Sequence, residues 1–96
     1  MKPFDFTVPL RGTYDAGLGL PAAVTLRPIR VRDELAVQSV KDPAEAEVRL
    51  VISLTELPRA SLLELESADY GAIVAKVVAI REGKHLGASR GEPGNG

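Results

Sequence analysis

The stretch from Asp42 to Leu57 constrains the fold more than any other part of the chain. It opens with Asp42, Pro43 and Glu45, which suit the N-cap, first and third positions of an α-helix. Apolar side chains then recur at helical spacing, at Val48, Leu50, Val51, Ile52, Leu54 and Leu57. Because this stripe is broad, and Pro58 interrupts it, the sequence predicts a helix up to Leu57 that is the most buried of the chain.

Period-two alternation near the N-terminus predicts strands. Apolar residues alternate with other residues from Phe4 to Leu10, and the alternation resumes at Val24–Arg27. Pro9 has no amide hydrogen, so the first strand lies at an edge or ends there. The glycine-rich segment 11–21 predicts a loop. We therefore expect an antiparallel β-hairpin, which needs a cover because an isolated hairpin is barely stable in water.

Further helical segments are expected to supply that cover. Val31 and Leu35 lie one turn apart and favour a helix over Val31–Val40. A short helical turn is expected over Arg59–Leu65, with Leu62, Leu63 and Leu65 facing inward. Ser67 suits the N-cap of a last helix that ends at Gly83, with Asp69 in its first turn. Its apolar stripe is Tyr70, Ile73, Val74, Val77 and Val78, which we assign to the core, with a binding groove as the alternative.

The predicted fold class is therefore α+β, with an N-terminal antiparallel β-hairpin packed against three or four short helices. Ninety-six residues suit one domain. We place a single small domain at 1–83. Residues 84–96 are rich in glycine and poor in apolar side chains, so a disordered tail is expected there.

Composition excludes several classes of function. The chain has no cysteine, which removes disulfides, thiolate nucleophiles and cysteine-based zinc sites. No apolar run approaches the length of a membrane span, and the N-terminus lacks the apolar stretch of a signal peptide. A formal net charge of −1 gives no general attraction to nucleic acid. We therefore expect a soluble intracellular protein that contacts neither membranes nor, in general, nucleic acids.

Side chains suited to catalysis or cofactor binding are scarce. His85 is the single histidine, and it falls in the glycine-rich tail, where a general base could not be held against its target. Gly17-Leu18-Gly19-Leu20 resembles a phosphate-binding loop only faintly, because it precedes a strand rather than a helix. Glu64, Glu66 and Asp69 suggest a metal site or, as the simpler interpretation, a solvated acidic turn. We predict no enzyme, no cofactor and no bound metal.

Two groups of residues are candidates for contact with another macromolecule. Leu18 and Leu20 lie in the loop, where they either contact a partner or fold back onto the sheet. Arg27, Arg30 and Arg32 cluster between the second strand and the first helix. They form either a patch for phosphate or an acidic partner, or local ion pairs with Asp33 and Glu34.

Read in order, the chain resembles the tail assembly chaperones of Mu-like and related long-tailed phages, from about Val24 to Ile80. The matching pieces are Leu26-Arg27, then Asp33 with Leu35, the apolar helix ending in Leu54-Thr55, and Leu65 followed by Asp69-Tyr70. The chain departs from the pattern at three places. Arg30 stands where a Ser or Thr cap is common, the loop 11–21 is longer, and Glu56 replaces a common glycine.

The resemblance implies a non-enzymatic protein of a phage or prophage, acting in virion assembly in the host cytoplasm. Such chaperones are thought to bind the tape measure protein and to help tail tube subunits polymerise around it. The implied partner is therefore the tape measure protein, with the tail tube protein and a second copy of this chain as further candidates. The alternative is a small regulatory or nucleic-acid-binding module that uses Arg27, Arg30, Arg32 and the basic tail.

Overall fold

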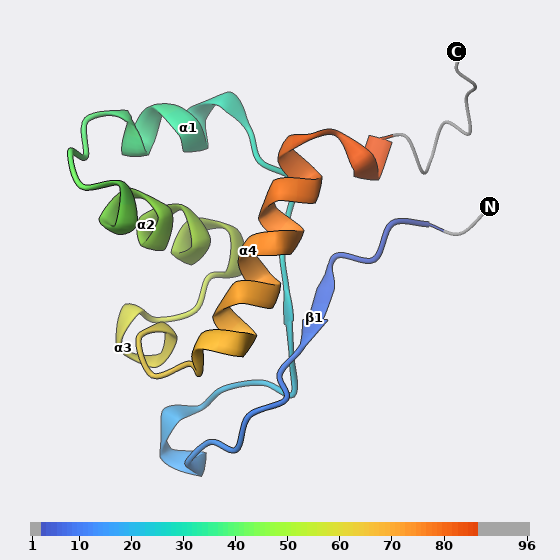
Figure 1. Ribbon diagram of the computed structural model, residues 1–96, viewed down its shortest axis with the longest axis vertical. Helices are drawn as coiled ribbons and strands as arrows, with labels where there is room; N and C mark the ends of the chain where they lie inside the picture. The colour runs from blue at the N-terminus through green and yellow to red at the C-terminus, as the bar shows by residue number, and fades with distance from the viewer. Residues whose placement is uncertain (1–2, 87–96) are drawn as a thin grey trace.

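A two-stranded sheet and four α-helices make up the structure, a computed structural model that describes residues 3–86 (Figure 1). Strands β1 (Thr7–Pro9) and β2 (Ala23–Thr25) are antiparallel, and a 3₁₀ turn, η1 (Ala16–Leu18), lies in the loop between them. Helices α1 (Val31–Gln38), α2 (Pro43–Thr55), α3 (Arg59–Leu62) and α4 (Ser67–Arg81) follow. The predicted α+β class, with a hairpin followed by helices, is confirmed.

The regular hairpin is shorter than the alternation predicted, with three residues in each strand. Val8 faces Val24 across the ladder, and both are buried. The amide of Thr7 donates to the carboxylate of Asp5 at 2.9 Å, and Pro9 has no amide to donate. Hydrogen bonds from Leu26 to Phe6 and from Leu10 to Ala22 still continue the pairing on either side.

Helix α4 lies at the centre of the fold, between the hairpin and the pair formed by α2 and α3 (Figure 1). It contacts β1 and α2, so its apolar side chains are covered from two directions. Helix α2 was expected to be the most buried, but it contributes Leu50, Val51 and Leu54 from one face only. The core is Val8, Val24, Leu26, Leu50, Val51, Leu54, Leu57, Leu62, Ile73, Val77 and Ile80.

Helix α2 begins and ends by different means. The carboxylate of Asp42 accepts a hydrogen bond from the amide of Ala44, with Pro43 in the first turn, which confirms the predicted helix start. At the other end Glu56 takes a left-handed conformation, with φ of 60°, and its amide bonds to Ile52. Glycine is favoured at such a position because a Cβ atom is strained there.

Helix α1 forms where predicted, and Val37 packs against the core, but the two apolar residues whose spacing predicted the helix do not. Val31 and Leu35 are 75% and 61% exposed, whereas Asp33 is buried on the inner side. The helix is held by polar contacts as well as by packing against α2, since Arg81 of α4 donates to Glu34 at 3.1 Å. Spacing alone indicated a helix here and did not indicate which side faces the protein.

The last two helices differ from prediction in detail. Leu62 is buried and Leu65 packs against the core, but Leu63 is 57% exposed and does not face inward. Ser67 is the first residue of α4 rather than its N-cap, which is Glu66. Val78, at the end of the predicted stripe, is 43% exposed.

The end of the described chain is folded back onto the N-terminal strand region. Gly83 follows α4 with φ of 80°, and residues 84–86 form a further helical turn. The His85 ring lies 6.0 and 5.8 Å from the rings of Phe4 and Phe6. The described part of the expected tail is therefore ordered onto these aromatics, and 87–96 lie outside the described residues.

We predict that Ile73→Ala lowers the free energy of unfolding by about 2–5 kcal/mol, because Ile73 is wholly buried and its removal leaves a cavity. Leu35→Ala is the control, since it truncates an exposed aliphatic side chain on a helix and should cost within about 0.5 kcal/mol. Urea unfolding of the two variants measures the difference. Equal stabilities would contradict the position assigned to α4.

We also predict that Glu56→Gly raises the free energy of unfolding by about 1 kcal/mol, because glycine adopts the left-handed conformation without strain. The matched control is Ser53→Gly, an exposed position inside α2, where glycine is unfavourable and stability should fall. Thermal unfolding of both proteins tests the sign. A destabilised Glu56→Gly variant would show that the α2 terminus is not strained.

Candidate functional site

The two loop leucines are only partly available to a partner. Leu20 is half-buried and packs against the core. This agrees with the alternative in which the loop leucines fold back onto the protein. Leu18 ends η1, and its carbonyl oxygen accepts a hydrogen bond from Ser61 Oγ at 2.9 Å. This bond attaches the loop to α3, so the loop is part of the folded domain.

Arg27 is engaged within the protein. Its two terminal nitrogens donate to the two carboxylate oxygens of Asp33, each at 2.8 Å, and the Arg30 amide donates to the same carboxylate at 2.8 Å. These contacts hold the pKa of Asp33 well below its usual range, the Arg27 guanidinium being the main cause. Asp33 is 6% exposed, so this is a buried carboxylate with a charged partner. Of the two interpretations of the arginine cluster, local ion pairing therefore applies to Arg27.

The predicted contact residues do not form one surface. The loop that carries Leu18 and Leu20 lies at one end of the molecule, and α1, where Arg30 and Arg32 are exposed, lies at the other (Figure 1). A role for these residues in binding a partner stays a prediction. If they bind, they bind as two separate surfaces.

Asp69 organises the loop that precedes β2. Its carboxylate accepts hydrogen bonds from the amides of Arg11 and Gly12, both at 2.9 Å, and from the Tyr14 hydroxyl at 2.5 Å. These three donors, with the Tyr14 hydroxyl the strongest, hold the pKa of Asp69 below its usual value. The Tyr14 oxygen in turn accepts from the Glu66 amide at 2.9 Å. Asp69 is 3% exposed, so the start of α4 is joined to the loop through a buried carboxylate.

A second carboxylate joins α2 to α3. Glu45 accepts two hydrogen bonds from Arg59, each at 2.8 Å, and one from Arg49 at 2.9 Å. These arginines, Arg59 first, lower the pKa of Glu45 to about 2. Glu45 was expected in the first turn of α2, and the structure shows that it also positions α3.

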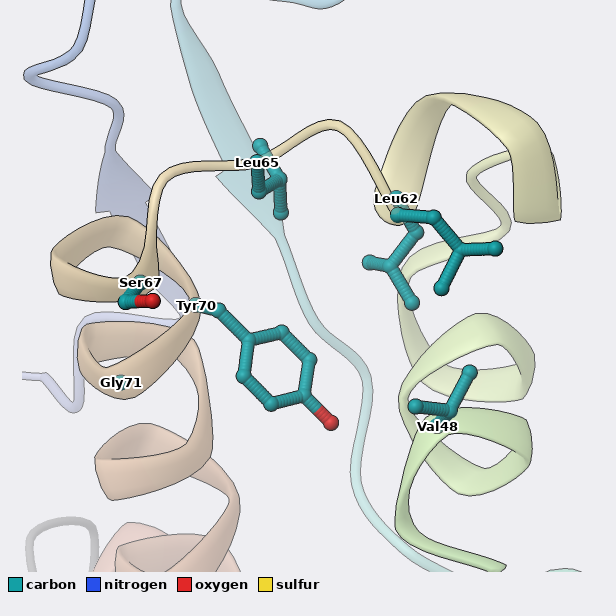
Figure 2. A pocket seen from close by; sticks show the side chains of 7 residues that line it. Val48, Leu62, Leu65, Ser67, Tyr70 and Gly71 are labelled. Carbon is teal, nitrogen blue, oxygen red and sulfur yellow. The ribbon is translucent and has the colours of Figure 1, made fainter. Parts of the chain in front are cut away.

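Beside this contact lies a hollow that we call the α2–α4 groove, with a volume of about 260 Å³. Figure 2 shows the Tyr70 ring reaching from α4 towards α2, with Val48 on one side and Leu62 and Leu65 above. The lining residues are Val48, Leu62, Leu63, Leu65, Ser67, Tyr70 and Gly71. Aliphatic and aromatic side chains make up most of this surface, so the groove suits apolar groups.

Tyr70 links the groove to a charged group. Its hydroxyl donates to Glu47 of α2 at 2.9 Å. Burial raises the pKa of Tyr70 above its usual value, and the hydrogen bond to Glu47 raises it further. The hydroxyl therefore acts as a neutral donor that braces α4 against α2.

Sequence reasoning offered a binding groove only as the alternative for the stripe that begins at Tyr70, and it did not locate the groove between α2 and α4. Tyr70 was assigned to the core stripe and Leu63 to the inner face, because helical spacing does not show where two helices diverge. One signal was present: Gly71 lies inside a helix next to an aromatic residue, where glycine is unfavourable without a packing or functional reason.

The described residues offer little for catalysis. Within 3–86 no three His, Asp or Glu side chains are placed to hold a metal ion. The carboxylate of Asp69 is occupied by hydrogen bonds from the loop amides of Arg11 and Gly12. His85 lies against Phe4 and Phe6, and its Nδ1 is buried with no hydrogen-bond partner among the described groups. None of the helices in this range is both long and apolar enough to cross a bilayer.

Comparison with protein families gives a match to the family described as phage tail assembly chaperone proteins, E, or 41 or 14, over residues 22–80. The match covers more than half of the chain and extends from β2 into the end of α4. The protein therefore belongs to this family of tail assembly chaperones, and the suspected resemblance is confirmed. Comparison with curated proteins and with solved structures gives no match.

We predict that acid destabilises the protein mainly as the pH falls from about 4.5 towards about 2. Asp33, Glu45 and Asp69 all have folded-state pKa values below their ordinary ones. The folded state binds protons less readily than the unfolded state, so this stabilisation is present above the ordinary values and is lost below them. Thermal unfolding between pH 7 and pH 2 should show that decline.

The variant that isolates one carboxylate is Asp69→Asn, which should lower stability at neutral pH and make the decline below about pH 4 shallower. Glu64→Gln removes an exposed carboxylate instead and should follow the wild-type profile. A decline for Asp69→Asn as steep as that of the wild type would show that Asp69 does not contribute to it.

Proposed function

We propose that this protein binds the tape measure protein of a phage tail in the host cytoplasm, keeps it soluble during assembly of the tail tube, and catalyses no reaction. Membership of the tail assembly chaperone family supports a role with tail proteins. The α2–α4 groove supports a binding role, because most of its lining is apolar. The tail tube protein is a second candidate partner.

Helix-in-groove contact is the binding mode that the geometry supports best. The other mode considered, addition of a strand to the hairpin, needs backbone amides at a free edge. In β1 the outward-facing positions are Thr7, whose amide is bonded to Asp5, and Pro9, which has none. Strand β2 offers an edge of only three residues. The groove accepts side chains rather than backbone, so it does not depend on a free strand edge.

Co-expression with the tape measure protein of the phage or prophage that encodes this chain tests the proposal. We expect the tape measure protein to stay soluble in its presence and to co-purify at low and at moderate salt, because salt weakens exposed ion pairs far more than apolar contacts. An equally soluble tape measure protein without this chain, and no complex at either salt, would refute the proposal. Retention of DNA with a steep salt dependence would favour the nucleic-acid-binding alternative.

A further inference from the structure

We propose that the α2–α4 groove is where the tape measure protein docks, through an amphipathic helix whose apolar side chains enter the groove and whose Lys or Arg side chains face Glu47 and Glu64. This inference rests on the function proposed above and names the surface and the chemistry of the partner segment. It is carried by the lining of the groove, the charge at its border and the contacts that fix its walls.

The size and lining of the groove fit side chains better than a free small molecule. Pockets for small molecules usually enclose about 300–1,000 Å³ and place several polar groups against the ligand. This groove is smaller, at about 260 Å³, and the polar groups of its lining are Ser67 and the Tyr70 hydroxyl, which is already bonded to Glu47. Apolar anchors at helical spacing, presented by one face of a helix, match such a surface.

Charge at the border of the groove favours a particular charge on the partner helix beside its apolar face. Glu47 lies at the groove through its bond to Tyr70, and Glu64 lies between the lining residues Leu63 and Leu65 with its side chain exposed. Two arginines of the neighbouring helices, Arg49 of α2 and Arg59 of α3, are both paired with Glu45. The unpaired charge at the border is therefore acidic, which favours a basic partner segment.

The walls of the groove are fixed before any partner arrives. Arg59 and Glu45 hold α3 against α2, and Tyr70 and Glu47 hold α4 against α2. The start of α4 is fixed as well, because the Tyr14 oxygen accepts a hydrogen bond from the amide of Glu66, the residue just before the helix. A site that is already formed needs little ordering when it binds, so more of the contact energy contributes to affinity.

Gly71 provides a way to close the groove without disturbing the fold. It lines the groove in the second turn of α4, and a Cβ atom added there would meet nothing within 4 Å. Leucine at this position suits a helix better than glycine, so Gly71→Leu should fold and should occupy the space that a partner side chain requires. Ala72→Leu is the matched control, because Ala72 is exposed on the same helix and is not part of the groove lining.

The experiment uses the full chain co-expressed with the tape measure protein, followed by affinity measurement on the purified components. We expect Gly71→Leu to weaken binding at least about tenfold, the change that loss of one well-buried anchor produces, and Ala72→Leu to bind like the wild type. Circular dichroism and the unfolding midpoint confirm that each variant is folded. If Gly71→Leu does not fold, Leu63→Ala removes part of the lining from an exposed position and should also weaken binding.

Charge is tested with Glu64→Lys, which should weaken binding most at low salt, against Glu82→Lys, which makes the same change beyond the end of α4. If a folded Gly71→Leu variant binds as tightly as the wild type, the proposed docking site is wrong and the proposed function still stands. A wild-type protein that does not bind the tape measure protein at all would overturn both. Weakening by Gly71→Leu with tighter binding by Glu64→Lys would show an acidic partner segment and overturn the proposed chemistry.

Discussion

The position of the N-terminal loop relative to α4 depends on the hydrogen bonds that the carboxylate of Asp69 accepts. This carboxylate accepts hydrogen bonds from two backbone amides and a tyrosine hydroxyl of a loop that lies more than fifty residues earlier in the chain. Without it, those donors would be left unsatisfied beside a helix start, and buried unpaired polar groups are costly. Gly12 belongs to the same contact, since a Cβ atom there would lie 2.7 Å from the Tyr14 hydroxyl. The position of α4, and hence of the groove, follows from this junction.

The residues that carry the family resemblance act mainly on the fold. Arg27 and Asp33 pair across the connection from β2 to α1, and Asp69 anchors the loop. Tyr70 both braces α4 and lines the groove. The departures from the family pattern have structural counterparts: Asp33 bonds the amide of Arg30 at the α1 start, the long loop is held by Asp69, and Glu56 takes the left-handed conformation that glycine usually provides.

Local patterns were sufficient for the elements and insufficient for the site. The start of α2 at Asp42 and the stripe on α4 were predictable because capping and helical spacing involve neighbours in sequence. The bonds from Tyr14 to Asp69 and from Arg59 to Glu45 join distant segments, and no local rule specifies them. The exposure of Val31, Leu35 and Leu63 was missed for the same reason, since spacing identifies a helix but not what covers it.

The closed edge of β1 limits how copies of this chain can associate through their sheets. A sheet that is open on both sides can add strands without end, which is how edge pairing leads to fibres. Here one side has no amide hydrogen to offer, because Thr7 is bonded to Asp5 and Pro9 has none. The amides of β2 favour pairing of β2 with β2 of a second copy, and this symmetric pairing stops at a dimer because it uses the β2 edge of both molecules.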